Sequence, residues 1–422
     1  MTDGERPVDP ALLRGMTRAR AARLARPRRR DVLALGGLAT AGVALAACTG
    51  SGGTKPAAVQ AETAVERFWA GQKKHGHVNF ANWPLYIDTG HKTLQEFTAA
   101  TGITVSYAEV IQEDPYWVNK ISPIIRARES IGYDLMVVTN GFWFAELLTQ
   151  GELIPLDQGM LANFHSYAAA KFQRRSFDPG NTYSIPWASG TTGIAWNPQF
   201  IHTPITSINE LWNPAYQGRV GMMADTQDLG NFGMLKLGID PETSTPADWR
   251  AAAKVLTQQR AAGLVRGYYQ QSYIDELTSG RTWISMAWSG DIFQQNLTSG
   301  TGLKFVIPDE GGTLWTDNMM IPKYAQNPVD AMLLMDWYYR PEIAAQLTES
   351  INYISAVPAA QRIIAAAAAK ATGSARQTLQ EVATSDLVWP TAAEYRRLVN
   401  YADVSGKLQA EYESVFNPVI AG

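Results

Sequence analysis

One pair of carboxylates in this sequence has a spacing that could support chemistry. Asp225 and Asp228 are three residues apart, so on a helix they would share one face. Such a pair could serve glycoside hydrolysis, although hydrolases usually take their two acids from different elements. The pair could equally be a helix N-cap and a first-turn acid, because residues 229–237 look helical. The residues alone favour the capping interpretation.

A second candidate is an acid beside indole rings. Asp317 follows Trp315 by two residues, in a strand-like segment where an acid is disfavoured. Trp83 and Trp288 could supply further rings, although core packing is the commoner fate of tryptophan. The chain holds 13 tryptophans, more than a core needs, so we expect some to line a binding site. Asp317 is the residue that the sequence most readily marks as functional.

Other kinds of site have less support. The single cysteine excludes a disulfide scaffold and a zinc site built from several thiolates. The five histidines form no His-Glu-x-x-His motif, and the chain has no Gly-x-x-x-x-Gly-Lys-Ser/Thr loop for a nucleotide. An iron(III) site could use the tyrosine pairs Tyr268-Tyr269 and Tyr338-Tyr339. The second pair falls in a predicted helix and the first has no histidine nearby, so this interpretation is disfavoured.

The first 47 residues predict an export signal. Nine arginines precede an apolar run at 32–47 that is short for a membrane-spanning helix. Arg29-Arg30-Asp31-Val32-Leu33 resembles a twin-arginine signal, and Leu45-Ala46-Ala47-Cys48 resembles the lipobox of a bacterial lipoprotein. The Gly/Ser-rich residues 49–54 are typical of a flexible tether. We therefore expect a mature chain that begins at Cys48 and carries lipid on that residue.

Removal of this leader changes the sign of the charge. The leader holds nine basic and four acidic residues, whereas the whole chain holds 36 basic and 39 acidic residues, so the mature chain has a net charge of −8. An acidic protein is a poor partner for nucleic acid. The same charge is compatible with a cationic ligand.

Helices and strands alternate along the mature chain. Residues 55–75 predict an N-terminal helical extension. Strands are expected at 78–81, 103–107 and 134–138, the last covered on both faces because it is almost wholly apolar. A helix is expected at 94–100, with Gly102 as its C-terminal stop. This alternation predicts an α/β fold.

The ordered set of motifs from about residue 78 to 358 resembles the solute-binding proteins of ABC importers, in the spermidine/putrescine-binding branch. The resembling segments, in order, are Asn82-Trp83 with Tyr86; 94–107; Tyr133-Asp134-Leu135; Phe177-Asp178-Pro179 with Tyr183-Ser184-Ile185-Pro186; Leu211-Trp212-Asn213-Pro214; Trp288-Ser289-Gly290; Glu310-Gly311-Gly312 with Trp315-Thr316-Asp317; and Arg340-Pro341-Glu342.

This resemblance implies two α/β lobes, each a mixed sheet flanked by helices, with the ligand in a cleft between them. The chain is expected to cross between lobes near Trp187, Trp315 and Val357. The expected divisions are 1–47 signal peptide; 48–76 tether and extension; 77–186 lobe 1; 187–314 lobe 2; 315–357 lobe 1 return; and 358–422 lobe 2 return with C-terminal helices.

A polyamine is a flexible apolar chain that carries ammonium groups, so it needs carboxylates and flat π faces. The resemblance implies that Asp317 pairs with an amine, that Trp315 and Trp288 supply π faces, and that Trp83 closes the cleft from lobe 1. Further site positions implied by the resemblance are Asp225, Asp228, Phe142 and Tyr353.

The first-lobe half of this implied site is altered. Pro84 and Leu85 stand where the family has a polar residue and then an acid, so one ammonium anchor is missing. Phe142 keeps a ring where the family has a tyrosine, and Pro390 replaces an amide. A shorter diamine, or another organic cation, fits this half as well as spermidine does.

The resemblance implies a non-enzymatic lipoprotein that captures a polyamine for ABC permease subunits with a cytoplasmic ATPase. We expect a monomer on the outer face of the cytoplasmic membrane, with no cofactor, metal or nucleic-acid partner. The alternative function is that of a secreted carbohydrate-binding protein or a glycoside hydrolase that uses Asp225 and Asp228.

Overall fold

The computed structural model describes residues 57–402 and 404–422, and Cys48, the leader and the tether lie outside that range. Residues 56–422 form one compact unit. The strands are β1 His77–Asn82, β2 Thr104–Glu109, β3 Leu135–Thr139, β4 Ser184–Trp196, β5 Val220–Met223, β6 Val265–Tyr269, β7 Ile284–Trp288, β8 Lys304–Val306, β9 Gly312–Met320 and β10 Leu398–Val399.

Helices precede, separate and follow these strands. They are α2 Ala57–Ala70, α3 Lys92–Thr101, α4 Asp114–Arg126, α5 Phe142–Thr149, α6 Ala162–Tyr167, α7 Thr226–Lys236, α8 Pro246–Ala261, α9 Tyr273–Thr278, α10 Ser289–Ser299, α11 Pro328–Trp337, α12 Pro341–Ile351, α13 Ala359–Lys370, α14 Gly373–Thr384, α15 Ala392–Tyr395 and α16 Gly406–Ala421. The expected N-terminal helix, the first three strands and the helix that ends at Gly102 are confirmed.

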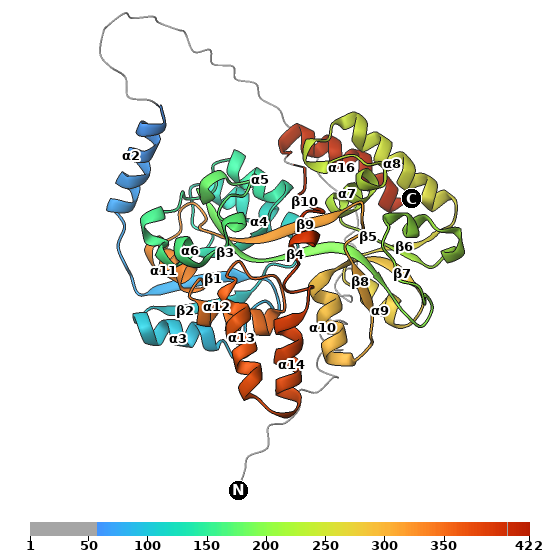
Figure 1. Ribbon diagram of the computed structural model, residues 1–422. Coiled ribbons are helices and arrows are strands. Elements are labelled where there is room, and N and C mark those ends of the chain that lie inside the picture. The colour runs from blue at the N-terminus through green and yellow to red at the C-terminus, as the bar shows by residue number, and fades with distance from the viewer. Residues whose placement is uncertain (1–56, 403) are drawn as a thin grey trace, which may run out of the picture. The chain divides into compact units, whose positions relative to one another are not determined.

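One mixed sheet runs through the described residues, in the order β2-β1-β3-β9-β4-β7-β5-β6. The long strands β4 and β9 are antiparallel to each other and join a first half (β2, β1, β3) to a second half (β7, β5, β6). Figure 1 shows these two strands extending from one half to the other. The expected α/β fold with a mixed sheet in each half is confirmed, and the two halves share one continuous sheet because they pair with β9 and β4.

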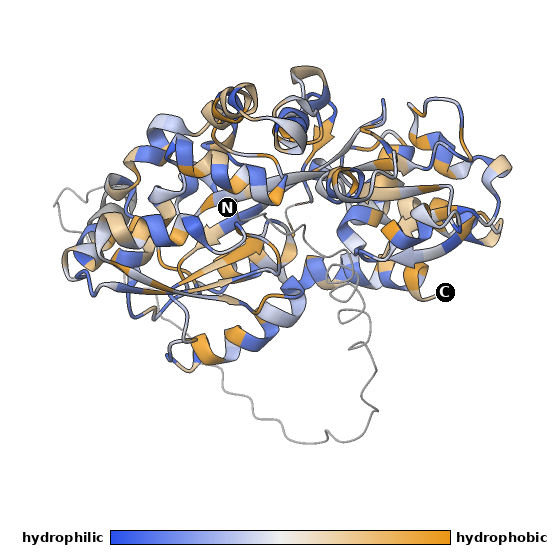
Figure 2. Cartoon of the chain, turned by 90° about the horizontal axis from the view of Figure 1, so that it is seen from below, coloured by the Kyte–Doolittle hydropathy of each residue, from blue (hydrophilic) through white to orange (hydrophobic). Residues whose placement is uncertain are grey.

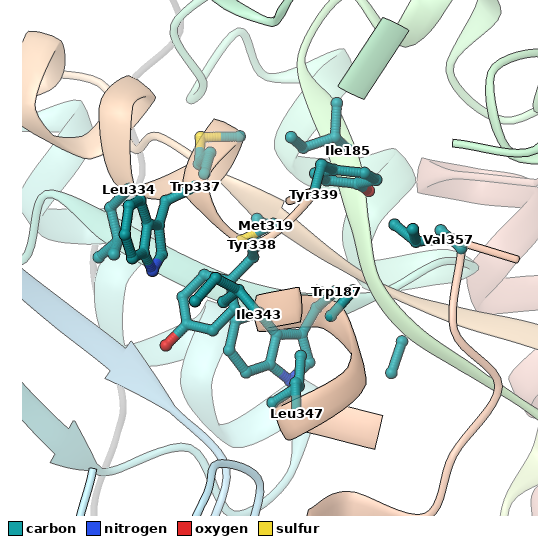
Figure 3. Close-up of a cluster of buried hydrophobic side chains, with 14 of the residues drawn as sticks. Ile185, Trp187, Met319, Leu334, Trp337, Tyr338, Tyr339, Ile343, Leu347 and Val357 are labelled. Carbon is teal, nitrogen blue, oxygen red and sulfur yellow. The ribbon is translucent and has the colours of Figure 1, made fainter. Parts of the chain in front are cut away.

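Apolar residues cover both faces of the first half. On β3, Leu135 and Val137 join one buried cluster, with helices α3, α11, α12 and α13. Met136 and Val138 join another, with helices α4 and α5. This alternation follows from the period of two along a strand and confirms that β3 is covered on both faces. Figure 3 shows part of the first cluster, in which the rings of Trp187 and Tyr338 lie 4.5 Å apart.

The second half has its own core. Residues of β5 and β7 pack there with α7, α8, α9, α10 and α16. In Figure 2 apolar colour is concentrated on the strands and on the helices beside them. The two cores meet along β4 and β9, where buried polar side chains such as Thr192, Thr316 and Asn318 are mixed with apolar ones.

The last part of the chain differs from the expected division. Residues 358–422 were expected to return to lobe 2, but Ala360 and Ile364 of α13 and Val382 of α14 pack in the core of the first half. In this last part of the chain, the first fully buried residue of the second core is Ala402, just after β10, which pairs with the start of β9. The physical reason is the apolar face of α13, which is buried against α12 rather than against the second core.

Candidate functional site

Asp317 lies in the middle of the sheet, where β9 passes between β3 and β4. Its register partners are Thr139 on β3 and Ala188 on β4. Thr139 Oγ1 donates a hydrogen bond to Asp317 Oδ1 at 2.7 Å, and the Tyr86 hydroxyl donates to Oδ2 at 2.6 Å. Asp317 is only 6% exposed. Burial raises the pKa of Asp317 to about 6, against the opposing effect of these two hydroxyls.

Aromatic rings lie close to this carboxylate. The ring of Tyr353 is 5.4 Å from that of Trp315 and 5.7 Å from that of Tyr86, measured between centroids. Trp315 lies flat over Gly190, since a Cβ added at Gly190 would be 2.2 Å from Trp315 Cζ2. Trp315 and Asp317 are two residues apart on β9, so both side chains leave the same face of the sheet.

Asp228 is the second acid that is held by aromatic donors. It lies in the first turn of α7 and is 1% exposed. Trp288, at the end of β7, donates from Nε1 to Asp228 Oδ2 at 2.9 Å, and the Tyr401 hydroxyl donates to Oδ1 at 3.2 Å. Burial and the nearby charge of Asp225 raise the pKa of Asp228 to about 7. Two residues that the sequence analysis named as separate site candidates, Asp228 and Trp288, are thus joined by a direct hydrogen bond.

Asp225 is the N-cap of α7. Its Oδ1 accepts the backbone N–H groups of Gln227 and Asp228, each at 2.9 Å. The capping interpretation of this position is confirmed, since these bonds are those of an N-cap. Burial raises the pKa of Asp225 even though both N–H groups oppose the shift. Asp225 therefore adds negative charge to the site, with one oxygen already bound to its own helix.

Two further aspartates belong to the same region and were missed by the sequence analysis. Asp291, one residue after the Trp288-Ser289-Gly290 motif, accepts the hydroxyls of Tyr353 at 3.0 Å and Tyr273 at 3.1 Å. Its place directly after that motif was the available signal.

Asp114 is the other missed acid, and its sequence offered no signal beyond a helix start. Its Oδ1 accepts the backbone N–H of Thr139 at 3.4 Å. Burial, then the charge of Asp317, raises the pKa of Asp114 to about 8, and Asp225 adds to the shift. Asp114 thus lies within electrostatic range of acids from both halves of the sheet.

Four of the acids, all aspartates, have no lysine or arginine partner among the described residues. No ion pair between residues described by the structure includes Asp114, Asp225, Asp228 or Asp317. The principal influences on the pKa of each are burial, neighbouring carboxylates and hydrogen-bond donors, and none is a lysine or arginine. Clustered carboxylates of this kind favour a bound cation, because it removes their mutual repulsion and their cost of desolvation.

The residues expected to form the first-lobe side of the site have surroundings unlike those of these acids. Trp83 is half-buried and donates from Nε1 to the Val137 carbonyl at 3.1 Å, so its ring is held against the middle of β3. The ring of Phe142 is buried 4.9 Å from that of Tyr412 in the second core. Leu85 is 55% exposed, and no charge is present at that position. Trp315 and Tyr353 therefore lie in the region of Asp317, whereas Phe142 lies in the second core.

The alternative iron site gains no support. Tyr338 exchanges a hydrogen bond with Thr93 at 3.0 Å, and burial raises the pKa of Tyr338 and of Tyr339 well above its ordinary value. A raised pKa disfavours the phenolate that would bind iron(III). Within the part of the chain that the structure describes, no group of three or more His, Cys, Asp or Glu side chains is arranged to hold a metal ion.

None of the described helices is long and apolar enough to cross a lipid bilayer. Residues 92–376 match the bacterial extracellular solute-binding protein family. The spermidine/putrescine-binding periplasmic protein of Salmonella typhimurium is 28% identical over 344 residues, which cover 81% of this chain and 91% of the relative. A putrescine/cadaverine-binding protein of Pseudomonas aeruginosa is 30% identical over 283 residues, which cover 64% of this chain and 77% of the relative.

A solved structure has the same fold. It is a spermidine/putrescine ABC transporter substrate-binding protein from Streptococcus pneumoniae, with a TM-score of 0.69 at 22% identity. The match covers 81% of this chain and 98% of the other.

Proposed function

This chain belongs to the bacterial extracellular solute-binding protein family, and on that premise we propose that it captures a polyamine for an ABC importer. The relatives named above bind spermidine, putrescine or cadaverine according to their names. The proposed ligand is a putrescine-like diamine or a related organic cation. It would be delivered to ABC permease subunits driven by a cytoplasmic ATPase.

One observation carries the proposal: buried carboxylates without a basic partner lie against aromatic rings. Asp317 and Asp228 would each accept an ammonium group, since a carboxylate has lone pairs left after two hydrogen bonds. Trp315, Trp288 and Tyr353 would face the methylenes and the charged ends.

The energies of these contacts are sufficient for capture at low concentration. A cation–π contact contributes about 0.5–2 kcal/mol, and a charge-assisted hydrogen bond contributes about 1.5–3 kcal/mol. Three or four such contacts, less the cost of ordering the ligand, reach roughly −8 kcal/mol, which corresponds to micromolar affinity.

Opening of the two halves would admit the ligand. Asp317, Asp228 and Trp315 are almost completely buried. A ligand could therefore reach them only if the two halves moved apart. The proposed lobes hinge where β4 and β9 pass between the cores, near Trp187 and Trp315. Tyr353 and Phe142 would then form part of the closing surfaces.

Export and anchoring follow from the leader. We expect twin-arginine export, lipid on Cys48, and a monomer held at the outer face of the cytoplasmic membrane. For this function the protein would need no cofactor or metal and would catalyse no reaction.

Titration calorimetry of the mature chain would test this function. Putrescine, cadaverine and spermidine should give saturable heat with micromolar or tighter affinity, whereas glucose and maltose should give none. Sugar binding without amine binding would overturn the proposal, as would sustained turnover of a chromogenic glycoside. A glycosidase that used Asp225 and Asp228 would lose that turnover in the Asp228→Asn variant.

A further inference from the structure

The start of helix α4 holds an acid that neither its helix nor an ion pair explains. Asp114 is the first residue of α4, where an acid commonly interacts with the helix N–H groups. The Asp114 carboxylate instead accepts a hydrogen bond from outside the helix, because Oδ1 accepts from the backbone N–H of Thr139. Asp114 as a whole residue is half-buried.

Thr139 connects this carboxylate to that of Asp317. The backbone N–H of Thr139 donates to Asp114, and the Thr139 hydroxyl donates to Asp317 at 2.7 Å. One residue at the end of β3, Thr139, thus donates hydrogen bonds to two carboxylates from different elements, α4 and β9. Like charges this close are unfavourable without a cation between or beside them.

A second observation indicates that the face of β9 next to Asp317 meets a ligand. Trp315 Nε1 is buried and has no hydrogen-bond partner among the described residues. Trp315 is 8% exposed and leaves the same face of β9 as Asp317. A buried indole N–H without an acceptor costs free energy of folding. Trp315 Nε1 is therefore a donor in this region that a ligand could satisfy.

We propose that Asp114 and Asp317 together bind one terminal cationic group of the ligand, and that this group must carry at least two N–H donors. This inference rests on the proposed function and deepens it. A primary ammonium has three donors and a guanidinium has five, so either can satisfy both carboxylates. A trimethylated ammonium has no N–H and cannot. The position also supplies charge to the first half of the site, where Pro84 and Leu85 have none.

The test compares putrescine with its bis(trimethylammonium) analogue, in which both ends are trimethylated and neither carries an N–H, by titration calorimetry on the mature chain. The wild-type protein should prefer putrescine strongly. Asp114→Asn should weaken putrescine binding about 10- to 100-fold, the effect of one charge-assisted hydrogen bond, and weaken binding of the trimethylated amine much less. Glu113→Gln, the matched control at the adjacent exposed residue, should leave both affinities unchanged.

The outcomes separate this inference from the proposed function. If the wild-type protein binds no diamine, the proposed function itself fails. If it binds putrescine and Asp114→Asn binds equally well with the same preference, only the role of Asp114 fails. A purely structural role would lower both affinities by the same factor, and that result would also overturn the inference.

A charge-conserving variant covers the case in which Asp114→Asn does not fold. Asp114→Glu moves the carboxylate by one methylene, so the preference among 1,3-diaminopropane, putrescine and cadaverine should change by severalfold. An unchanged chain-length preference would contradict direct contact.

Discussion

The hydroxyl of Tyr86 donates a 2.6 Å hydrogen bond to the carboxylate of Asp317, although 231 residues separate them in the chain. Tyr86 follows the first strand, and Asp317 lies on a strand that completes the sheet much later. The donor is itself packed against another candidate site residue, since the rings of Tyr86 and Tyr353 lie 5.7 Å apart. The hydrogen bond gives Asp317 a fixed geometry before any ligand is bound.

Replacement of Asp317 should remove cation binding without unfolding the protein. Asp317→Asn keeps an acceptor for Tyr86 and loses the charge, so putrescine affinity should fall about 10- to 100-fold. The melting temperature should stay the same or rise, because a buried carboxylate is removed. Calorimetry and thermal melting check this.

The matched control is Asp309→Asn, at an exposed acid that pairs with Arg397 on the surface. This variant should bind putrescine as the wild type does, since surface ion pairs contribute little. Unchanged affinity in Asp317→Asn would remove Asp317 from the site.

Close packing at Gly190 should be needed for the position of the Trp315 ring. Gly190→Ala places a methyl group against that ring, so we expect about 1–3 kcal/mol of destabilisation and a shifted tryptophan emission. Putrescine affinity should fall because Trp315 moves. Gly71→Ala, where the nearest atom is at an ordinary 3.5 Å, is the control. Normal affinity in Gly190→Ala would show that the ring position is unimportant.

Stability of the ligand-free protein should fall as pH rises from 5.5 to 8.5. The folded-state pKa values of Asp317, Asp228 and Asp114 are raised to about 6, 7 and 8, so the folded state binds more protons than the unfolded state in this range. The stabilisation from those protons is fully present below the ordinary aspartate pKa and is lost as pH rises through the raised values.

A diamine should reverse this loss, because it replaces the protons as the neutralising charge. Melting temperatures measured with and without putrescine should therefore diverge as pH rises, and affinity should increase over the same range. A ligand-free melting temperature that increases steadily from pH 5.5 to 8.5 would contradict the assignment.

Cys48→Ala should release the protein from the membrane fraction, because the proposed lipid is attached to that residue. The measurement is cell fractionation and immunoblotting, with Cys48→Ala compared against Ser51→Ala in the tether. Membrane retention of the cysteine variant would show that another feature holds the protein at the membrane.

The sequence by itself determined the local geometry. Asp225 is an N-cap because its side chain reaches N–H groups two and three residues ahead, which requires no distant partner. Gly102 ends α3 with a positive φ of 73°, again a local property. The ordered motifs also indicated the family, and they named Asp317, Asp228, Trp288 and Trp315 as candidate site residues.

Only the tertiary structure decided which of these residues meet. Asp317 lies between β3 and β4 because the sheet has the order β3-β9-β4, and that pairing brings Thr139 and Tyr86 to its two oxygens. Asp114 looked like an ordinary helix start, and the placement of α13 in the first core could not be read from its alanine-rich sequence. Backbone periodicity acts over a few residues and is written in the sequence, whereas strand order and register join segments hundreds of residues apart and exist only in the folded chain.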